Sequence, residues 1–242
     1  MDSIGHALPV DVRAIPGLEH LPYAEVWFHA VDEAVWAEAS AAACELGKPG
    51  LEAWTTTATP EVVEFLVARG YEEVRRYTIS ELDVVAAPDP GASAGRLVTF
   101  AERPELADEL YALARVAYGD QPGRAGSRID EAWFDWGLRA SEPEGSFIGL
   151  DGGRAVAYGS IERKDDGLWW HGFLAVAREH RGRGLAGAIK RAQIAWAKAN
   201  GVPQLRTATE LRLEGMRALN RRLGYTPLYD EIVLRGPGHP AT

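Results

Sequence analysis

Cysteine is nearly missing from this chain of 242 residues, in which Cys44 is the only one. A single cysteine excludes an internal disulfide, and its place in a helical pattern predicts a small core residue. Long apolar runs are missing too, since no stretch reaches the length that spans a bilayer. The N-terminus lacks the basic and then apolar regions of a signal peptide. We therefore expect a cytoplasmic protein with no membrane partner.

A surplus of basic residues is also missing. The 26 Lys and Arg are outnumbered by 35 Asp and Glu, which gives a formal net charge of −9. Nucleic-acid binders usually carry a basic face, so no nucleic-acid partner is expected. A composition of 46% hydrophobic and 25% charged residues is typical of a globular protein. We expect a monomer or homodimer without a metal.

One basic, glycine-rich turn, residues 177–187, separates two regular patterns. The apolar run 168–176 before it predicts a strand, and the amphipathic run 185–199 after it predicts a helix. Glycines let backbone N–H groups approach an anion, and the start of a helix attracts negative charge. Arg181 and Arg183 add positive charge at this turn. The sequence therefore predicts a pyrophosphate site here.

The spacing Arg181-x-x-Gly184-x-Ala186 resembles the acyl-CoA signature of the GNAT superfamily of N-acetyltransferases, Arg/Gln-x-x-Gly-x-Gly/Ala. From Arg96 onward the expected elements follow the order β, α, α, β, β, β, α, β, α, β, as in that family. The resemblance implies an α+β (α/β sandwich) fold, with a mixed central sheet flanked by helices. It also implies transfer of an acetyl or other acyl group from acetyl-CoA (acyl-CoA) to a primary amine, by direct attack. A small-molecule amine is the expected acceptor.

A segment rich in proline, glycine and alanine predicts a linker at residues 88–95. We expect a complete GNAT acetyltransferase domain at 96–242. Residues 1–87 are expected to form a partial, degenerate GNAT-like unit. They lack the opening strands, and Val31-Asp32-Glu33 stands where the glycine-arginine turn would lie. Because acidic side chains repel a pyrophosphate, this unit is predicted to have no cofactor site.

The N-terminal half also repeats part of the sequence pattern of the C-terminal half. Thr57-Ala58-Thr59, a helix and Gly70-Tyr71 are similar to Thr207-Ala208-Thr209, a helix and Gly224-Tyr225. An alternative explanation is that alternating strands and helices are common, and that Gly-Tyr after a helix is ordinary end-capping chemistry.

The resemblance implies two sets of cofactor contacts. Backbone amides of the turn and helix start would face the pyrophosphate, and they belong to Arg181, Gly182, Arg183, Gly184, Leu185 and Ala186. The end of the preceding strand would pair its backbone with the pantetheine arm, through Leu174, Ala175 and Val176. This works because a GNAT sheet splays open after that strand, leaving main-chain groups without a partner.

The late helix departs from the family pattern. Many members place a tyrosine four residues before the Gly-aromatic pair, as general acid for the departing thiolate, whereas this chain has Asn220. An asparagine can hydrogen-bond the cofactor but cannot usefully give up a proton. Asn220 is therefore a candidate for both cofactor binding and catalysis. The alternative is a solvated polar residue at a helix end.

Candidates for the base that takes the proton of the amine lie on or beside central strands: His171, Glu162 and Glu210. His171 is one residue off the face that Trp170 and Leu174 share, unless a bulge changes the phase. Each candidate, taken singly, is more often structural. Catalysis in GNATs depends largely on holding amine and thioester together, so a dedicated base is not required.

Two other functions stay open. Loss of the tyrosine is consistent with a non-catalytic acyl-CoA-binding protein. Gly182, Gly184 and Gly187 also spell Gly-x-Gly-x-x-Gly, but five residues separate the strand end from Gly182. In a nicotinamide-dinucleotide site the first glycine lies close to the end of the strand, so this alternative ranks below the acyl-CoA site.

Overall fold

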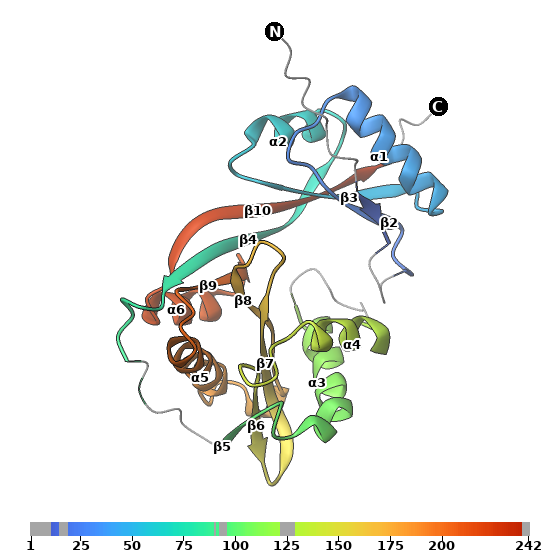
Figure 1. Ribbon diagram of the computed structural model, residues 1–242. Coiled ribbons are helices and arrows are strands. Elements are labelled where there is room, and N and C mark those ends of the chain that lie inside the picture. Colours follow the sequence, from blue (N-terminus) through green and yellow to red (C-terminus); the bar gives the residue numbers. More distant parts are fainter. Residues whose placement is uncertain (1–10, 15–18, 90, 92–95, 122–128, 239–242) are drawn as a thin grey trace. The chain divides into compact units, whose positions relative to one another are not determined.

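The computed structural model describes residues 11–14, 19–89, 91, 96–121 and 129–238, without the side chains of residues 96, 133 and 136 (Figure 1). The chain divides into two compact units. Unit 1 takes in the described residues up to Arg76 and from Tyr229 onward, and unit 2 runs from Tyr77 to Leu228. In these described ranges there is no helix with the length and apolar character to cross a membrane.

Unit 2 contains the expected order of elements. From residue 96 these are β5 (Arg96–Thr99), the 3-10 helix η1 (Pro104–Leu106), α3 (Ala107–Gly119), α4 (Glu131–Arg139), β6 (Phe147–Asp151), β7 (Arg154–Arg163), β8 (Trp169–Val176), the 3-10 helix η2 (Arg178–His180), α5 (Leu185–Ala199), β9 (Gln204–Glu210) and α6 (Glu214–Arg222). Its strands lie in the order β5-β6-β7-β8-β9-β4-β10, with β4 (Glu72–Asp83) and β10 (Thr226–Pro237) at one end. Helices α3 and α4 cover one face of β6–β8, while α5 and α6 lie on the other side (Figure 1).

Strand β7 shows why this arrangement forms. Its six residues from Val156 to Ile161 are all buried, because helices cover both faces of the sheet there. Helix α5 fits the same layer with Ile189, Ile194 and Ala197 buried on its sheet side. Ile194 and Ala197 of α5 share a buried cluster with Leu205 of β9 and with Tyr225.

Unit 1 is smaller. It holds β1 (Val12–Arg13), β2 (Tyr23–Trp27), α1 (Glu33–Glu45), β3 (Gly50–Thr56) and α2 (Pro60–Val67), and its strand order is β1-β2-β3-β10-β4. Asp32 caps α1, since its Oδ1 accepts a hydrogen bond of 2.9 Å from the Val35 amide. The expectation that Cys44 is a core residue is wrong, because Ala39 and Ala43 occupy the buried side of α1 and Cys44 is exposed.

Two strands are exchanged between the halves of the chain. Strand β4 comes from the N-terminal half, yet its residues Tyr77–Asp83 pair with β9 of unit 2. Strand β10 follows α6, yet its residues Glu231–Pro237 pair with β3 of unit 1. The units therefore divide elsewhere than at the expected linker 88–95, of which residues 90 and 92–95 lie outside the described part. A linker can be predicted from local composition, whereas the pairing of strands that are far apart in the sequence leaves no local signal.

Candidate functional site

Strands β8 and β9 diverge in unit 2. They are parallel neighbours, yet they pair only at Trp169 with Leu205 and at Trp170 with Arg206. Beyond these pairs β8 continues along β7, and β9 continues along β4. We call this divergence the β8–β9 split. It matches the opening that the family resemblance implies after the strand, and the predicted residues 174–176 form the β8 side of it.

The basic turn lies at the open end of β8. Gly182 and Gly184 have φ values of +74° and +82°, which favour glycine. A Cβ added at either position would meet no atom within 4 Å, so backbone conformation and not crowding requires glycine there. Gly184 is the N-cap of α5, and its helix start has no side-chain cap. The amides of Leu185 and Ala186 in this first turn suit an anion.

The arginines of this region have partners that the sequence did not indicate. Arg181 donates from Nε to the Val176 carbonyl at 3.0 Å and from its guanidinium to Asp120 Oδ2 at 2.7 Å. Arg178 also donates to Asp120, and the two arginines hold the pKa of that carboxyl below its usual range. The Arg181 side chain thus ties the turn to β8 and to the end of α3. Of the two arginines predicted to bind the pyrophosphate, Arg181 and Arg183, the exposed Arg183 is the one whose side chain is open to a ligand.

A β-bulge interrupts β8 at its split end. Ile161 lies opposite His171, but Gly159 lies opposite Leu174, so two residues of β8 face Ser160 alone. Ser160 Oγ accepts a hydrogen bond of 2.9 Å from the Phe173 amide and so holds the bulge. The bulge changes the phase of the strand, and the face expected for Trp170 and Leu174 is not continuous.

His171 is buried beneath α5. Its Nδ1 lies 2.8 Å from Gln193 Oε1, while the Gln193 amide nitrogen donates to the carbonyls of Gly159 and Ser160. Nδ1 must therefore donate, and Nε2 accepts from the Tyr225 hydroxyl. Burial lowers the pKa of His171 well below its ordinary value. With both ring nitrogens bonded, His171 is a positioning residue for β8 rather than an acceptor of the substrate proton.

Glu162 lies on the opposite face of the sheet, beside the bulge. A Cβ added at Gly172 would lie 3.7 Å from Glu162 Cδ. The Glu162 side chain is 18% exposed and forms an ion pair of 2.6 Å with Lys164. On the same face of β7, burial raises the pKa of Tyr158 to about 12, so that its hydroxyl stays protonated. The sequence did not indicate Tyr158, since aromatic residues in central strands are usually core.

Asn220 is not a solvated helix-end residue. It is buried, and its Nδ2 donates to Thr209 Oγ1 at 2.9 Å. Its Oδ1 is buried and has no hydrogen-bond partner among the described residues. A small cavity of about 50 Å³ lies beside it, lined also by Arg217 and Arg221. A buried acceptor without a partner at this place suits an N–H donor of a ligand.

The sequence does not indicate Lys190 as a site residue, because a lysine in an amphipathic helix usually reaches solvent. Here it is 2% exposed, and its Nζ donates to Thr207 Oγ1 at 3.2 Å. Burial lowers the pKa of Lys190 to about 7.

This pKa predicts a pH dependence of stability. Above about pH 7 the folded protein leaves Lys190 neutral, while the unfolded chain keeps the proton up to about pH 10. The free energy of unfolding should therefore rise with pH in this window, by up to about 1.4 kcal/mol per unit. Urea unfolding at several pH values checks this, with Lys190→Met as the variant that lacks the rise. Parallel curves for both proteins would contradict it.

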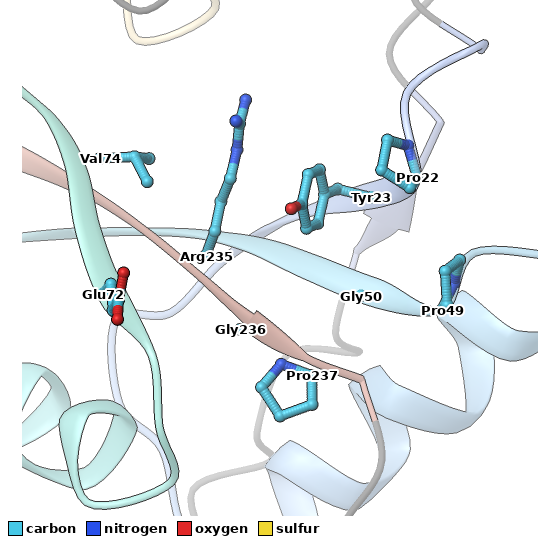
Figure 2. A pocket seen from close by; sticks show the side chains of 9 residues that line it. All are labelled: Pro22, Tyr23, Pro49, Gly50, Glu72, Val74, Arg235, Gly236 and Pro237. Carbon is cyan, nitrogen blue, oxygen red and sulfur yellow. The ribbon is translucent and has the colours of Figure 1, made fainter.

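In the described residues of unit 1, the corresponding strand pair and helix start differ from those of this site. Strands β2 and β3 pair along all of Tyr23–Trp27, so they do not diverge. The carboxylate of Asp32 already occupies the start of α1. Unit 1 has a hollow of about 430 Å³, but it lies at the N-terminal ends of β2 and β3. Figure 2 shows Tyr23 and Arg235 among the side chains that line it.

Comparison with protein families identifies the region that carries the split and the turn. The family model described as "Acetyltransferase (GNAT) family" matches residues 107–225, from α3 to Tyr225. The chain contains a GNAT-family domain. This domain has the expected α+β fold with a mixed sheet, and its family supports acyl transfer from acyl-CoA in general.

Solved structures give the same fold over most of the chain. A GCN5-related N-acetyltransferase from Sphaerobacter thermophilus has a TM-score of 0.71 at 18% identity, covering 96% of this chain and 77% of that one. A tandem GNAT protein from the clavulanic acid biosynthesis pathway has a TM-score of 0.64 at 21% identity, with 91% and 77% covered. No curated protein sequence matches the chain. At these identities the likeness shows the fold alone.

Proposed function

We propose that unit 2 is an N-acetyltransferase, which passes the acetyl group of acetyl-CoA to the primary amine of a small molecule. The observation that carries the proposal is the divergence of β8 and β9 immediately before a glycine turn in left-handed conformation at the start of α5. A strand edge open at one side and a helix start without a side-chain cap suit a long ligand that combines amides with a diphosphate.

Acetyl-CoA would be held by backbone groups of two elements. The amides from Arg183 to Ala186 would receive the diphosphate, with the exposed Arg183 side chain adding charge. The main chain of Leu174–Val176 would pair with the pantetheine arm. The orphaned Asn220 Oδ1 would accept an N–H group of that arm, in keeping with its buried and unsatisfied state.

The acceptor amine would approach from the face that carries Tyr158, Ser160 and Glu162. Its nitrogen attacks the thioester carbonyl directly, and the bond to sulfur breaks without an acyl-enzyme. Glu162 takes the proton of the amine, directly or through water, because it is the predicted base that lies beside the bulge. Holding the two reactants together supplies most of the acceleration. The net charge of −9 favours a cationic acceptor.

Exchange of Glu162 for glutamine tests this role. We expect kcat to fall by about 100-fold, the usual contribution of a positioned base, while the KM for acetyl-CoA stays unchanged. Steady-state kinetics at saturating amine measure both constants. Glu64→Gln, at an exposed position of α2, is the control. Equal kcat values for the two variants would show that no base at Glu162 is needed.

The alternative is an acyl-CoA-binding protein without turnover, which Asn220 in place of the family tyrosine favours. Release of free thiol from acetyl-CoA across a panel of amines separates the two. The acetyltransferase predicts thiol release that depends on at least one amine. Binding of acetyl-CoA with no release on any amine would favour the alternative.

A further inference from the structure

Lys190 is a buried cation with unusual surroundings. Its Nζ donates to Thr207 and lies 5.1 Å from the centre of the Tyr225 ring. No carboxylate forms an ion pair with it within the described ranges 19–89, 96–121 and 129–238. An ammonium group out of water is costly, and titratable groups perturbed in this way cluster at functional sites, which makes Lys190 a candidate functional residue.

Its contacts place Lys190 at the narrow end of the β8–β9 split. Thr207 is the first residue of β9 beyond the last pair with β8, and His171 is the first such residue of β8. Lys190 contacts Thr207, and the Tyr225 ring over which it lies donates its hydroxyl proton to His171. Asn220 contacts Thr209, two residues further along the same strand. Lys190 and Asn220 therefore lie over the same side of β9.

We propose that Lys190 stabilises the thiolate that leaves from acetyl-CoA and returns a proton to it. This inference rests on the proposed acetyltransferase function. It assigns to Lys190 the task of a general acid, which Asn220 cannot perform because an amide does not give up a proton at neutral pH.

The amine nitrogen forms a bond to the carbonyl carbon, and the carbon–sulfur bond breaks with its electron pair on sulfur. A proton passes from Nζ of Lys190 to sulfur, which gives coenzyme A as a free thiol. The proton lost by the amine goes to Glu162 or water, and Lys190 takes up another proton from solvent.

The surrounding groups suit this task. From β8 the group facing this layer is His171, which is held neutral. From the segment between α6 and β10 it is the Tyr225 hydroxyl, whose pKa is raised by burial. Thr207 of β9 and Gln193 of α5 do not ionise. Lys190, with its pKa lowered to about 7, is thus the group in this layer that can release a proton near neutral pH.

The test measures the thiol of bound coenzyme A, which requires no knowledge of the acceptor. Calorimetry first establishes binding to the wild-type protein and to Lys190→Met, which keeps the length of the side chain but removes its charge. A pH titration of the thiolate absorbance then gives the pKa of the bound thiol. We expect this pKa to be higher in Lys190→Met than in the wild type by about one pH unit or more.

Two further variants sharpen the test. Lys198→Met removes a lysine from the same helix whose Nζ contacts the Ala87 carbonyl, and it should leave the thiol pKa as in the wild type. Lys190→Arg keeps a charge that does not release its proton, so it should keep the lowered thiol pKa and slow amide formation at least about 10-fold.

The outcomes separate the two proposals. An equal thiol pKa in the wild type and Lys190→Met, with both binding coenzyme A, would overturn the role of Lys190 and leave the acetyltransferase standing. A wild-type protein that binds no coenzyme A would overturn both. Thermal unfolding of Lys190→Met shows that the variant is folded, and loss of an unpaired buried charge should not lower its melting temperature.

Discussion

Gly184→Glu should weaken the binding of acetyl-CoA by at least about 100-fold, or roughly 2.7 kcal/mol. The new carboxylate would stand at the N-cap of α5, where the amides are expected to receive the diphosphate, and would repel it. The backbone at this position has a φ of +82°, which a residue with a Cβ rarely adopts, so the substitution also strains the turn. Calorimetric titration with acetyl-CoA measures the loss.

A matched control lies at the other end of the same helix. Gly201 follows α5, has a φ of +67°, and would likewise place an added Cβ in open space. Gly201→Glu should therefore carry a similar backbone cost and an equal change in net charge, but leave the affinity for acetyl-CoA unchanged. Equal affinities of the two variants for acetyl-CoA would show that the diphosphate does not bind at the start of α5.

Glu52→Ala should destabilise unit 1 by about 3–5 kcal/mol. The carboxylate of Glu52 is buried in β3 and accepts hydrogen bonds from Arg75 and from Arg235, the latter at 2.9 Å. Truncation leaves two guanidinium groups without their shared partner, and the Arg75 side chain is only 1% exposed. The loss is therefore mainly the cost of buried charge without compensation.

Urea unfolding measures this change, with Glu73→Ala as the control. Glu73 also pairs with an arginine, Arg76, but its side chain is 41% exposed. Water replaces such a partner readily, so its removal should cost no more than about 1 kcal/mol. Similar losses for Glu52→Ala and Glu73→Ala would mean that burial does not set the strength of the Glu52 cluster.

The sequence predicts best those features that depend on neighbouring residues. The helix at 185–199 has the expected bounds. Gly182 and Gly184 adopt the left-handed conformation for which the turn requires glycine. Each of these depends on contacts within a few residues, and local sequence encodes such contacts directly.

Features built by distant residues were not predicted. Asp120 binds Arg181 across 61 positions, and residues 77–83 of β4 pair with β9, which lies more than 100 residues later in the chain. The sequence of β8 does not show where its bulge lies, because the bulge depends on the register with the neighbouring strand β7. Lys190 looks like a surface lysine until the packing of α5 on β9 is known.

A crystal structure with bound acetyl-CoA would show where the cofactor binds. We expect one molecule in unit 2, with its diphosphate on the amides of residues 183–186 and its arm between β8 and β9. Density for acetyl-CoA at any other place, such as the hollow beside Arg235 in unit 1, with none in the β8–β9 split, would contradict it.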